Sequence, residues 1–283
     1  MTSLEWKNKG KFYTINNQQV FVIDEGNADE TLVILHGYPT SSFDYYKALP
    51  FLSKKYRVII HDHLGFGFSD KPLNYSYSLI EQTDIALLLW KKLGLHEVTL
   101  LAHDYGTSIA TEIIARNNMN LLPFSIKELI LCNGSMHIEL AKLRTIQKLL
   151  KNKITGKWVA KLANQTVFNK NIRKIYVDSS KVSQEELNEM WFQLNYNNGR
   201  NVIHLLSNYI NERYFFWHRW IGGLTQTQIP TKIVWATHDP IAVKAIGEQL
   251  HKEIPNNELR WLENTGHFPM LENAKEWSGL VLR

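Results

Sequence analysis

The sequence of 283 residues contains one cysteine, Cys132, so it can form neither an internal disulfide nor a cysteine-rich zinc site. Long apolar runs are also missing, since stretches such as Ala86–Trp90 are far too short to cross a bilayer. The first residues, Met1–Trp6, have neither the basic start nor the apolar segment of a signal peptide. With 44% hydrophobic and 21% charged residues, the composition excludes a disordered or fibrous chain. These features predict a soluble, cytoplasmic globular protein.

Acidic residues are absent from one long stretch, residues 140–177, in a chain of net charge +5. Ten basic residues occur there: Lys142, Arg144, Lys148, Lys151, Lys153, Lys157, Lys161, Lys170, Arg173 and Lys174. Apolar residues at helical spacing lie among them: Leu143, Ile146, Leu149 and Leu150. The stretch either attracts anions, lipid headgroups or an acidic partner, or it is the solvated face of amphipathic helices. We favour the solvated face over contact with a membrane, because an isolated charge run usually has that role.

The sequence also lacks zinc-finger spacing and any aromatic pattern typical of RNA-binding modules, so no nucleic-acid partner is predicted. Short apolar segments instead alternate with amphipathic ones. The segments expected to be strands are Lys11–Ile15, Gln19–Asp24, Thr31–Leu35, Arg57–His61, Val98–Ala102, Ile126–Cys132, Lys232–Ala236 and Glu258–Leu262. The segments expected to be helices are Ser42–Leu52, Ser76–Leu93, Thr107–Asn117, Ala242–His251 and Met270–Leu282. This alternation predicts an α/β protein, with a parallel sheet covered by helices on both faces.

The alternation is interrupted between residues 135 and 223, where the sequence has little strand pattern and many aromatic residues. We therefore expect one α/β core formed by residues 1–134 and 224–283, with a helical insertion, residues 135–223, after the sixth strand.

Candidate catalytic residues follow the predicted strands. Ligands bind beyond the carboxyl ends of the strands in an open parallel sheet. The fifth, seventh and eighth strands are followed by Asp104, Asp239 and His267. The order nucleophile, acid, histidine along the chain is typical of the α/β-hydrolase triad. The sixth strand ends in Asn133, which is uncharged and cannot serve as the acid, and this favours Asp239.

Several motifs resemble one branch of the α/β-hydrolase superfamily. His36-Gly37-Tyr38-Pro39, Asp62–Pro72 and the turn around Asp104 are similar to those of epoxide hydrolases and haloalkane dehalogenases. Three further segments are similar to the mesoderm-specific transcript group of that branch: His103-Asp104-Tyr105-Gly106, Asn197-Asn198-Gly199 and Tyr209–Arg213. The resemblance implies an α/β-hydrolase fold with a mostly parallel eight-stranded sheet and a helical cap.

The resemblance also implies roles for individual residues. Asp104 is expected to be the nucleophile, His267 the base and Asp239 the acid that orients it. The backbone N–H groups of Tyr105 and Tyr38 are expected to form the oxyanion hole. Four residues are expected to contact the substrate: His36, Pro39, Tyr209 and Tyr214. No metal or organic cofactor is expected.

An aspartate nucleophile restricts the reaction. A carboxylate that attacks an acyl carbon gives an unfavourable anhydride, whereas attack on an sp³ carbon bearing a leaving group gives an ordinary ester. The expected substrate is therefore a small hydrophobic molecule with such a carbon, hydrolysed by water.

Tyr105 and Tyr38 stand where dehalogenases place halide donors, which favours an epoxide-hydrolase-like enzyme. No tyrosine lies between Tyr105 and Tyr176 to act as a second proton donor, so a dehalogenase or another hydrolase is an alternative. A non-catalytic binding protein on the same scaffold is a third interpretation.

Overall fold

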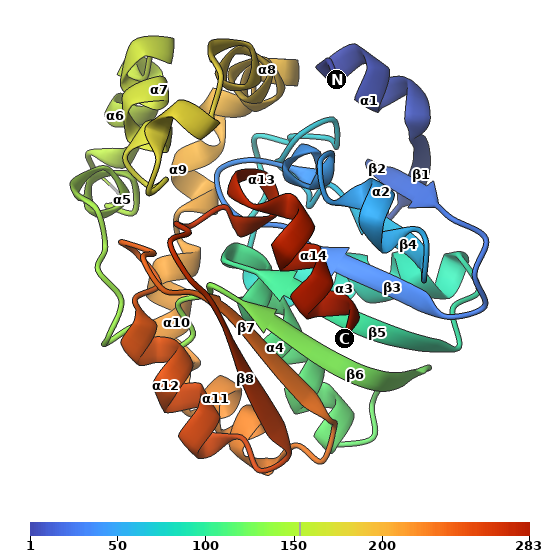
Figure 1. Ribbon diagram of the computed structural model, residues 1–283. Helices are drawn as coiled ribbons and strands as arrows, with labels where there is room; N and C mark the ends of the chain where they lie inside the picture. Colours follow the sequence, from blue (N-terminus) through green and yellow to red (C-terminus); the bar gives the residue numbers. More distant parts are fainter. Residues whose placement is uncertain (153) are drawn as a thin grey trace.

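An eight-stranded sheet forms the centre of the computed structural model, which describes residues 1–152 and 154–283 (Figure 1). Its strand order is β1-β2-β4-β3-β5-β6-β7-β8. The strands are β1 (Lys11–Ile15), β2 (Gln18–Glu25), β3 (Thr31–Leu35), β4 (Arg57–His61), β5 (Glu97–His103), β6 (Ser125–Cys132), β7 (Thr231–Ala236) and β8 (Asn257–Leu262). β2 pairs antiparallel with β1 and β4, and the remaining neighbours pair in parallel. The predicted α/β architecture is confirmed.

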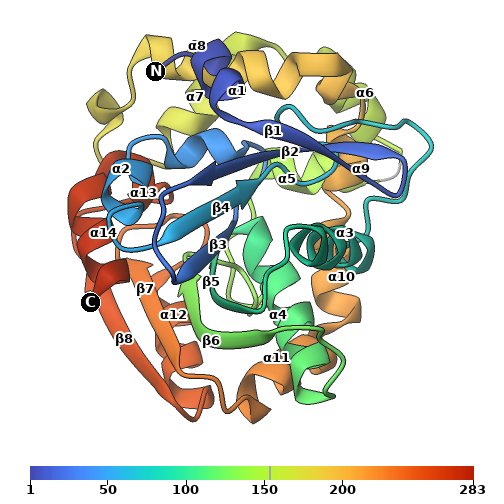
Figure 2. The same cartoon turned by 90° about the vertical axis from the view of Figure 1, so that its right-hand side faces the viewer.

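Helices cover both faces of the sheet because the parallel strands are apolar on both sides. In β3, Val33 and Leu35 pack into one core cluster, whereas Leu32 and Ile34 pack into the other. The first cluster includes α3 (Leu79–Lys92), α4 (Tyr105–Asn118), α11 (Trp217–Gln226) and α12 (Lys244–Glu253). The second includes α2 (Leu49–Leu52), α13 (Pro269–Glu272) and α14 (Ala274–Leu282). Figure 2 shows α3, α4 and α11 on one side of the strands and α2 and α14 on the other.

The insertion after β6 is helical, as expected. It contains α5 (Thr145–Leu150), α6 (Gly156–Leu162), α7 (Gln165–Arg173), α8 (Gln184–Asn195), α9 (Ile203–Leu206) and α10 (Tyr209–Phe215). Figure 1 shows α6, α7 and α8 together at the top, above the sheet. The expected boundary between residues 223 and 224 falls inside α11, which packs against α4 of the core. The division into a core and a cap domain stays a prediction.

One helix was not expected from the sequence. α1 (Ser3–Lys9) begins at a capping box formed by Thr2 and Glu5 and buries Trp6 completely. The N–H of Ser3 donates to the Glu189 carboxylate of α8 at 2.7 Å, so the N-terminal helix is attached to the insertion. Within residues 1–152 and 154–283, no helix has both the length and the apolar character needed to cross a bilayer.

Candidate active site

A sharp turn between β5 and α4 carries Asp104. Its backbone has φ 46° and ψ −109°, a conformation that costs about 1–3 kcal/mol for a residue with a side chain. A Cβ atom at Gly106 would lie 2.2 Å from the carbonyl oxygen of Leu35, so only glycine allows the turn to approach β3 so closely. The Asp104 side chain is buried at the end of the strand, where it contacts the loop after β3 and the loop after β8.

The Asp104 carboxylate is held by one backbone donor and one imidazole. Its Oδ1 accepts a hydrogen bond of 2.8 Å from the N–H of Tyr38, and its Oδ2 lies 3.5 Å from Nε2 of His267. Tyr105 begins α4, so its N–H is one of the free amides of the first helical turn. Burial alone would raise the pKa of Asp104, but His267 and the charge of Arg213 hold this pKa below its usual range. Asp104 is therefore ionised at neutral pH.

His267 links Asp104 to a second carboxylate. Its Nδ1–H donates to Oδ2 of Asp239 at 2.7 Å, and Oδ1 of Asp239 accepts hydrogen bonds from the N–H groups of Ile241 and Ala242 at 2.7 and 3.0 Å. Burial alone would lower the pKa of His267, but Asp239 and Asp104 raise it to about 10. The three side chains form a line in which a protonated imidazole lies between two carboxylates.

Asn133, which the sequence analysis excluded as the acid, supports Asp239. Its Nδ2 donates to Oδ2 of Asp239 at 2.9 Å, while its Oδ1 accepts a 2.9 Å hydrogen bond from the N–H of Ala236. His103 has a comparable supporting role, because its Nε2–H donates to the carbonyl oxygen of His267 at 2.8 Å. Burial lowers the pKa of His103 to about 4, so this ring is neutral. Both residues fix the orientation of the site from the ends of β6 and β5.

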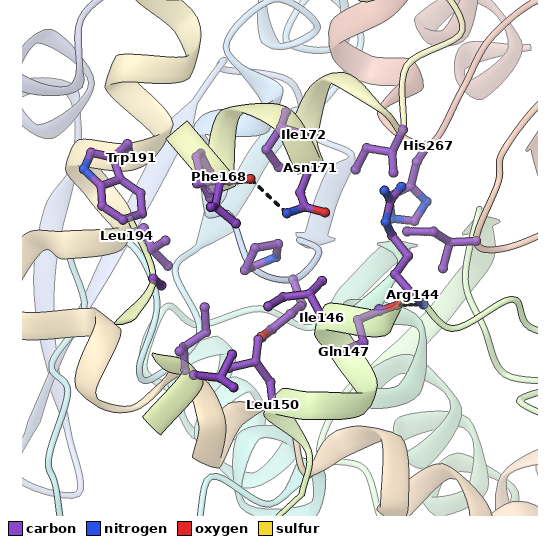
Figure 3. Close-up of a pocket in the computed structure, with 18 of the residues that line it drawn as sticks. Arg144, Ile146, Gln147, Leu150, Phe168, Asn171, Ile172, Trp191, Leu194 and His267 are labelled. Carbon is purple, nitrogen blue, oxygen red and sulfur yellow. Dashed lines mark hydrogen bonds between the residues drawn. The ribbon is translucent and has the colours of Figure 1, made fainter. Parts of the chain in front are cut away.

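A cavity lies between these groups and the inserted helices (Figure 3). It encloses about 820 Å³ that protein atoms do not fill, with its open mouth included. Its lining is mainly apolar and comes from the insertion: Ile146, Leu150, Val159, Val167, Phe168, Ile172, Ile175, Trp191, Leu194 and Ile203. Asp104 and His267 line it from the core, and Arg144, Gln147 and Asn171 add polar groups. This cavity suits a largely hydrophobic molecule of modest size.

The expected substrate contacts fall into three groups. Pro39 lines the cavity. Tyr209 and His36 are buried but do not line the cavity. The Tyr209 hydroxyl accepts a 3.2 Å hydrogen bond from Gln147. Nε2 of His36 accepts a 3.0 Å hydrogen bond from the N–H of His63. Tyr214 lies outside the site, because its side chain is 52% exposed and lines a separate groove beside Lys151. The sequence could not separate the two tyrosines, because both lie on the short helix α10.

The sequence analysis assigned no role to Arg213, which is 1% exposed on α10. Its Nη2 donates to the main-chain carbonyl of Asp104 at 2.9 Å, and its Nε donates to the Ser108 hydroxyl at 2.7 Å. The guanidinium carbon lies 4.6 Å from the centre of the Tyr209 ring. Arg213 thus connects the insertion to the turn that carries Asp104. The segment Tyr209–Arg213 drew attention only by its resemblance to the mesoderm-specific transcript group, and nothing in the sequence predicted this contact.

Comparisons with known proteins show the family and the fold of the chain. A putative hydrolase of Mycobacterium tuberculosis, LipZ, is 34% identical over 278 residues, which are 98% of this chain and 96% of LipZ. The mesoderm-specific transcript homolog protein of Homo sapiens is 36% identical over 278 residues, covering 95% of this chain and 83% of that protein. A solved haloalkane dehalogenase, DbeA from Bradyrhizobium elkani, has the same fold, with a TM-score of 0.80, 18% identity and coverage of 96% and 95%. The resemblance inferred from the motifs is confirmed. Residues 30–274 match the model of the alpha/beta hydrolase fold family, and the chain belongs to that family.

Proposed function

We propose that the protein is an epoxide-hydrolase-like enzyme that works through a covalent ester on Asp104. The observation that carries this proposal is the ionised Asp104 carboxylate at the wall of an apolar cavity, with His267 3.5 Å away. A buried carboxylate is a competent nucleophile towards an sp³ carbon, and the product is an alkyl ester. Pro39, together with the apolar residues of the insertion, contacts the hydrophobic part of the substrate.

In the first half-reaction, one Asp104 oxygen forms a bond to an epoxide carbon while the bond from that carbon to the epoxide oxygen breaks. The oxygen that leaves the carbon needs a proton. The protonated His267 supplies it, because its Nε2 lies 3.5 Å from the attacking Asp104 carboxylate. Burial and the charge of Asp104 raise the pKa of Tyr209, so its hydroxyl stays neutral and keeps the hydrogen bond from Gln147 at the cavity wall.

The second half-reaction begins because the ester has lost the charge of Asp104. Asp104 is one of the two groups that raise the pKa of His267, so ester formation lowers that pKa and leaves a neutral imidazole. His267 then takes a proton from water, whose oxygen attacks the ester carbonyl. The N–H groups of Tyr38 and Tyr105 stabilise the oxyanion. The bond from the Asp104 carbonyl carbon to the alkyl oxygen then breaks, and that oxygen takes the remaining proton of the former water, so the diol leaves with Asp104 ionised and His267 protonated.

This proton balance favours an epoxide over an alkyl halide. Epoxide opening consumes a proton, and donating it leaves His267 as the neutral base that the second half-reaction needs. A departing halide takes no proton, so His267 would first have to lose its proton to solvent. A halide also needs N–H donors of its own, and Tyr105 and Tyr38 contribute no indole or amide side chain there. A dehalogenase remains the second candidate, and a non-catalytic binding protein the third. A cytoplasmic location and the absence of a cofactor stay predictions.

The test is intact-mass analysis of the His267→Gln variant after exposure to a panel of epoxides and short haloalkanes. We expect the mass to rise slowly by that of one whole epoxide. Solvent water supplies the proton that His267 gives in the wild type, ring opening loses no atoms, and the variant cannot hydrolyse the ester. Peptide mapping should locate the addition on Asp104. The matched control is Asp104→Ala/His267→Gln, which should gain no mass.

Three outcomes contradict parts of the proposal. An adduct formed only with haloalkanes, with loss of the halide, identifies a dehalogenase. An adduct on another residue removes Asp104 as the nucleophile. If no adduct forms with any electrophile in the panel and the wild-type protein produces no diol, the epoxide-hydrolase proposal is wrong.

A further inference from the structure

Helix α6 exposes apolar side chains to solvent. Ile154, Trp158 and Leu162 are 80%, 65% and 76% exposed. Residues four apart lie on the same face of a helix, so Trp158 and Leu162 form one apolar stripe, and Ile154 precedes it at the same spacing. We call Ile154, Trp158 and Leu162 the outer stripe. Large apolar groups gathered on one surface of a protein mark an interaction site.

The inner side of α6 is already occupied. Ala160 is buried, and Val159 lines the cavity that contains Asp104 and His267. The helix is therefore apolar on two sides, and only the inner one is covered. Packing within the chain accounts for Val159 and Ala160 but not for the outer stripe.

Lysines flank the outer stripe. Lys157 and Lys161 are exposed on α6, each one residue before a member of the stripe. They belong to the segment 140–177, which contains ten basic and no acidic residues. None of the nine basic residues that the structure describes in this segment forms an ion pair within the described chain. The surface therefore has an excess of positive charge that no neighbouring side chain neutralises.

From this juxtaposition we propose that the outer stripe and its lysines dock the protein onto an anionic lipid bilayer. An interfacial helix places an indole and aliphatic side chains at the boundary between headgroups and acyl chains while lysines contact anionic headgroups. An acidic protein would satisfy the charge but would not require a row of tryptophan, isoleucine and leucine so exposed. The sequence analysis favoured a solvated face, and the exposure of the outer stripe reverses that preference. Docking in this orientation brings the cavity wall formed by α6 next to the bilayer.

The experiment is co-sedimentation of the full chain, without substrate, with vesicles of phosphatidylcholine alone or containing about 30% phosphatidylglycerol. We expect binding only to the anionic vesicles, weakening as salt increases. Each lysine near an anionic surface contributes about 1 kcal/mol, which is about fivefold in affinity. Lys157→Gln/Lys161→Gln should therefore weaken binding about 25-fold, and Trp158→Ser/Leu162→Ser at least tenfold.

Two matched control variants distinguish binding through the outer stripe and its lysines from nonspecific adsorption to the vesicles. Leu121→Ser removes an apolar side chain of similar exposure from the loop after α4, and Lys275→Gln removes a lysine from α14. Both should bind like the wild type. Trp158→Leu should still sediment with the vesicles but lose the blue shift of tryptophan emission, which places that residue in the lipid interface.

Circular dichroism should show that all variants remain folded. No sedimentation with anionic vesicles, or equal sedimentation with both lipid compositions, overturns the proposal. It is also overturned if the controls weaken binding as strongly as the variants of α6. A wild-type dimer that Trp158→Ser/Leu162→Ser dissociates would show that a second copy, and not lipid, covers the stripe. Because no substrate is present, these outcomes are independent of the proposed reaction.

Discussion

The sheet core and the helical insertion contribute to the site in different ways. The core supplies Asp104 directly after β5, and Asp239 and His267 in the loops that follow β7 and β8; pairing with neighbouring strands fixes the position of each of these strands. The insertion supplies most of the cavity wall and Arg213, from short helices that pack mainly on one another and on the strand ends. The sheet core thus holds the reactive groups rigidly. The shape of the cavity depends instead on the helical insertion, whose local constraints are weaker. Substitutions in the two regions should therefore differ in size and in kind.

The largest effect is expected from the core. Asp104→Ala should lower turnover of a substrate identified by the trapping experiment at least about 10⁴-fold, because no other group replaces the proposed nucleophile. The side chain points into the cavity, so the midpoint of thermal unfolding should change by less than about 5 °C. Diol formation and circular dichroism measure the two effects. Wild-type turnover in this variant would show that the reactive groups lie elsewhere.

The free energy of unfolding should fall at alkaline pH. The pKa of His267 is 6.5 in an unfolded chain and about 10 in the folded protein, so the folded state binds the proton more tightly. This contribution is complete below pH 6.5 and is lost as the pH rises towards about 10, by at most about 5 kcal/mol.

Urea titrations of the wild type and His267→Gln at pH 6.5 and pH 9.5 measure this loss. The difference between the two proteins should shrink with increasing pH. Buried Lys71, whose pKa is lowered to about 8, acts in the opposite direction, but it is common to both proteins and cancels. A difference that is constant with pH would mean that His267 is not held as a cation.

Arg213 tests the connection between the two regions. Arg213→Met should slow ester formation about 100-fold, because the Asp104 carbonyl and the Ser108 hydroxyl both lose a donor. It should also move the acidic limb of the pH–rate profile to higher pH, since the charge of Arg213 helps to lower the pKa of Asp104.

Arg213→Lys keeps the charge and should restore the position of that limb but only part of the rate. Mass measurements of adduct formation in the His267→Gln background, repeated across pH, provide both numbers. If Arg213→Met slows the reaction without moving the limb, Arg213 acts only through packing.

The smallest effects separate two tyrosines of α10. Tyr209→Phe should lower the rate of epoxide opening about fivefold, because Gln147 at the cavity wall loses its hydrogen-bond acceptor while the ring remains. Tyr214→Phe, at an exposed position outside the cavity, should change the rate less than about twofold. Equal rates for wild type and Tyr209→Phe would show that the hydrogen bond between Gln147 and Tyr209 does not influence the reaction.

The same contrast explains what the sequence could predict. Three strands, Lys11–Ile15, Thr31–Leu35 and Arg57–His61, were predicted with their observed bounds, and the other five to within one residue at each end. The parallel strands are easy to find because a buried parallel strand is a short apolar run between turn residues. Asp104, Asp239 and His267 were found because each follows such a run. Their proximity is now observed, whereas their catalytic roles stay predictions.

The insertion was predicted only as helical. Its helices have four to twelve residues, and their packing partners are distant in the sequence. The sequence therefore could not show that Arg213 contacts the turn at Asp104, that Tyr214 points away from the cavity, or that Trp158 faces solvent. Helix α1 was missed because its one large buried side chain, Trp6, gives no periodic pattern.

The backbone of Asp104 has a consequence for how this sequence can evolve. At φ 46° and ψ −109° every side chain is penalised, and glycine is the residue that the backbone itself favours. A lineage that no longer needed a reactive group there would gain stability by drifting to glycine. Asp104 therefore adopts a backbone conformation that is unfavourable for a residue with a side chain. A residue other than glycine in this strained conformation points to a role for its side chain, which favours a functional site over an inert scaffold.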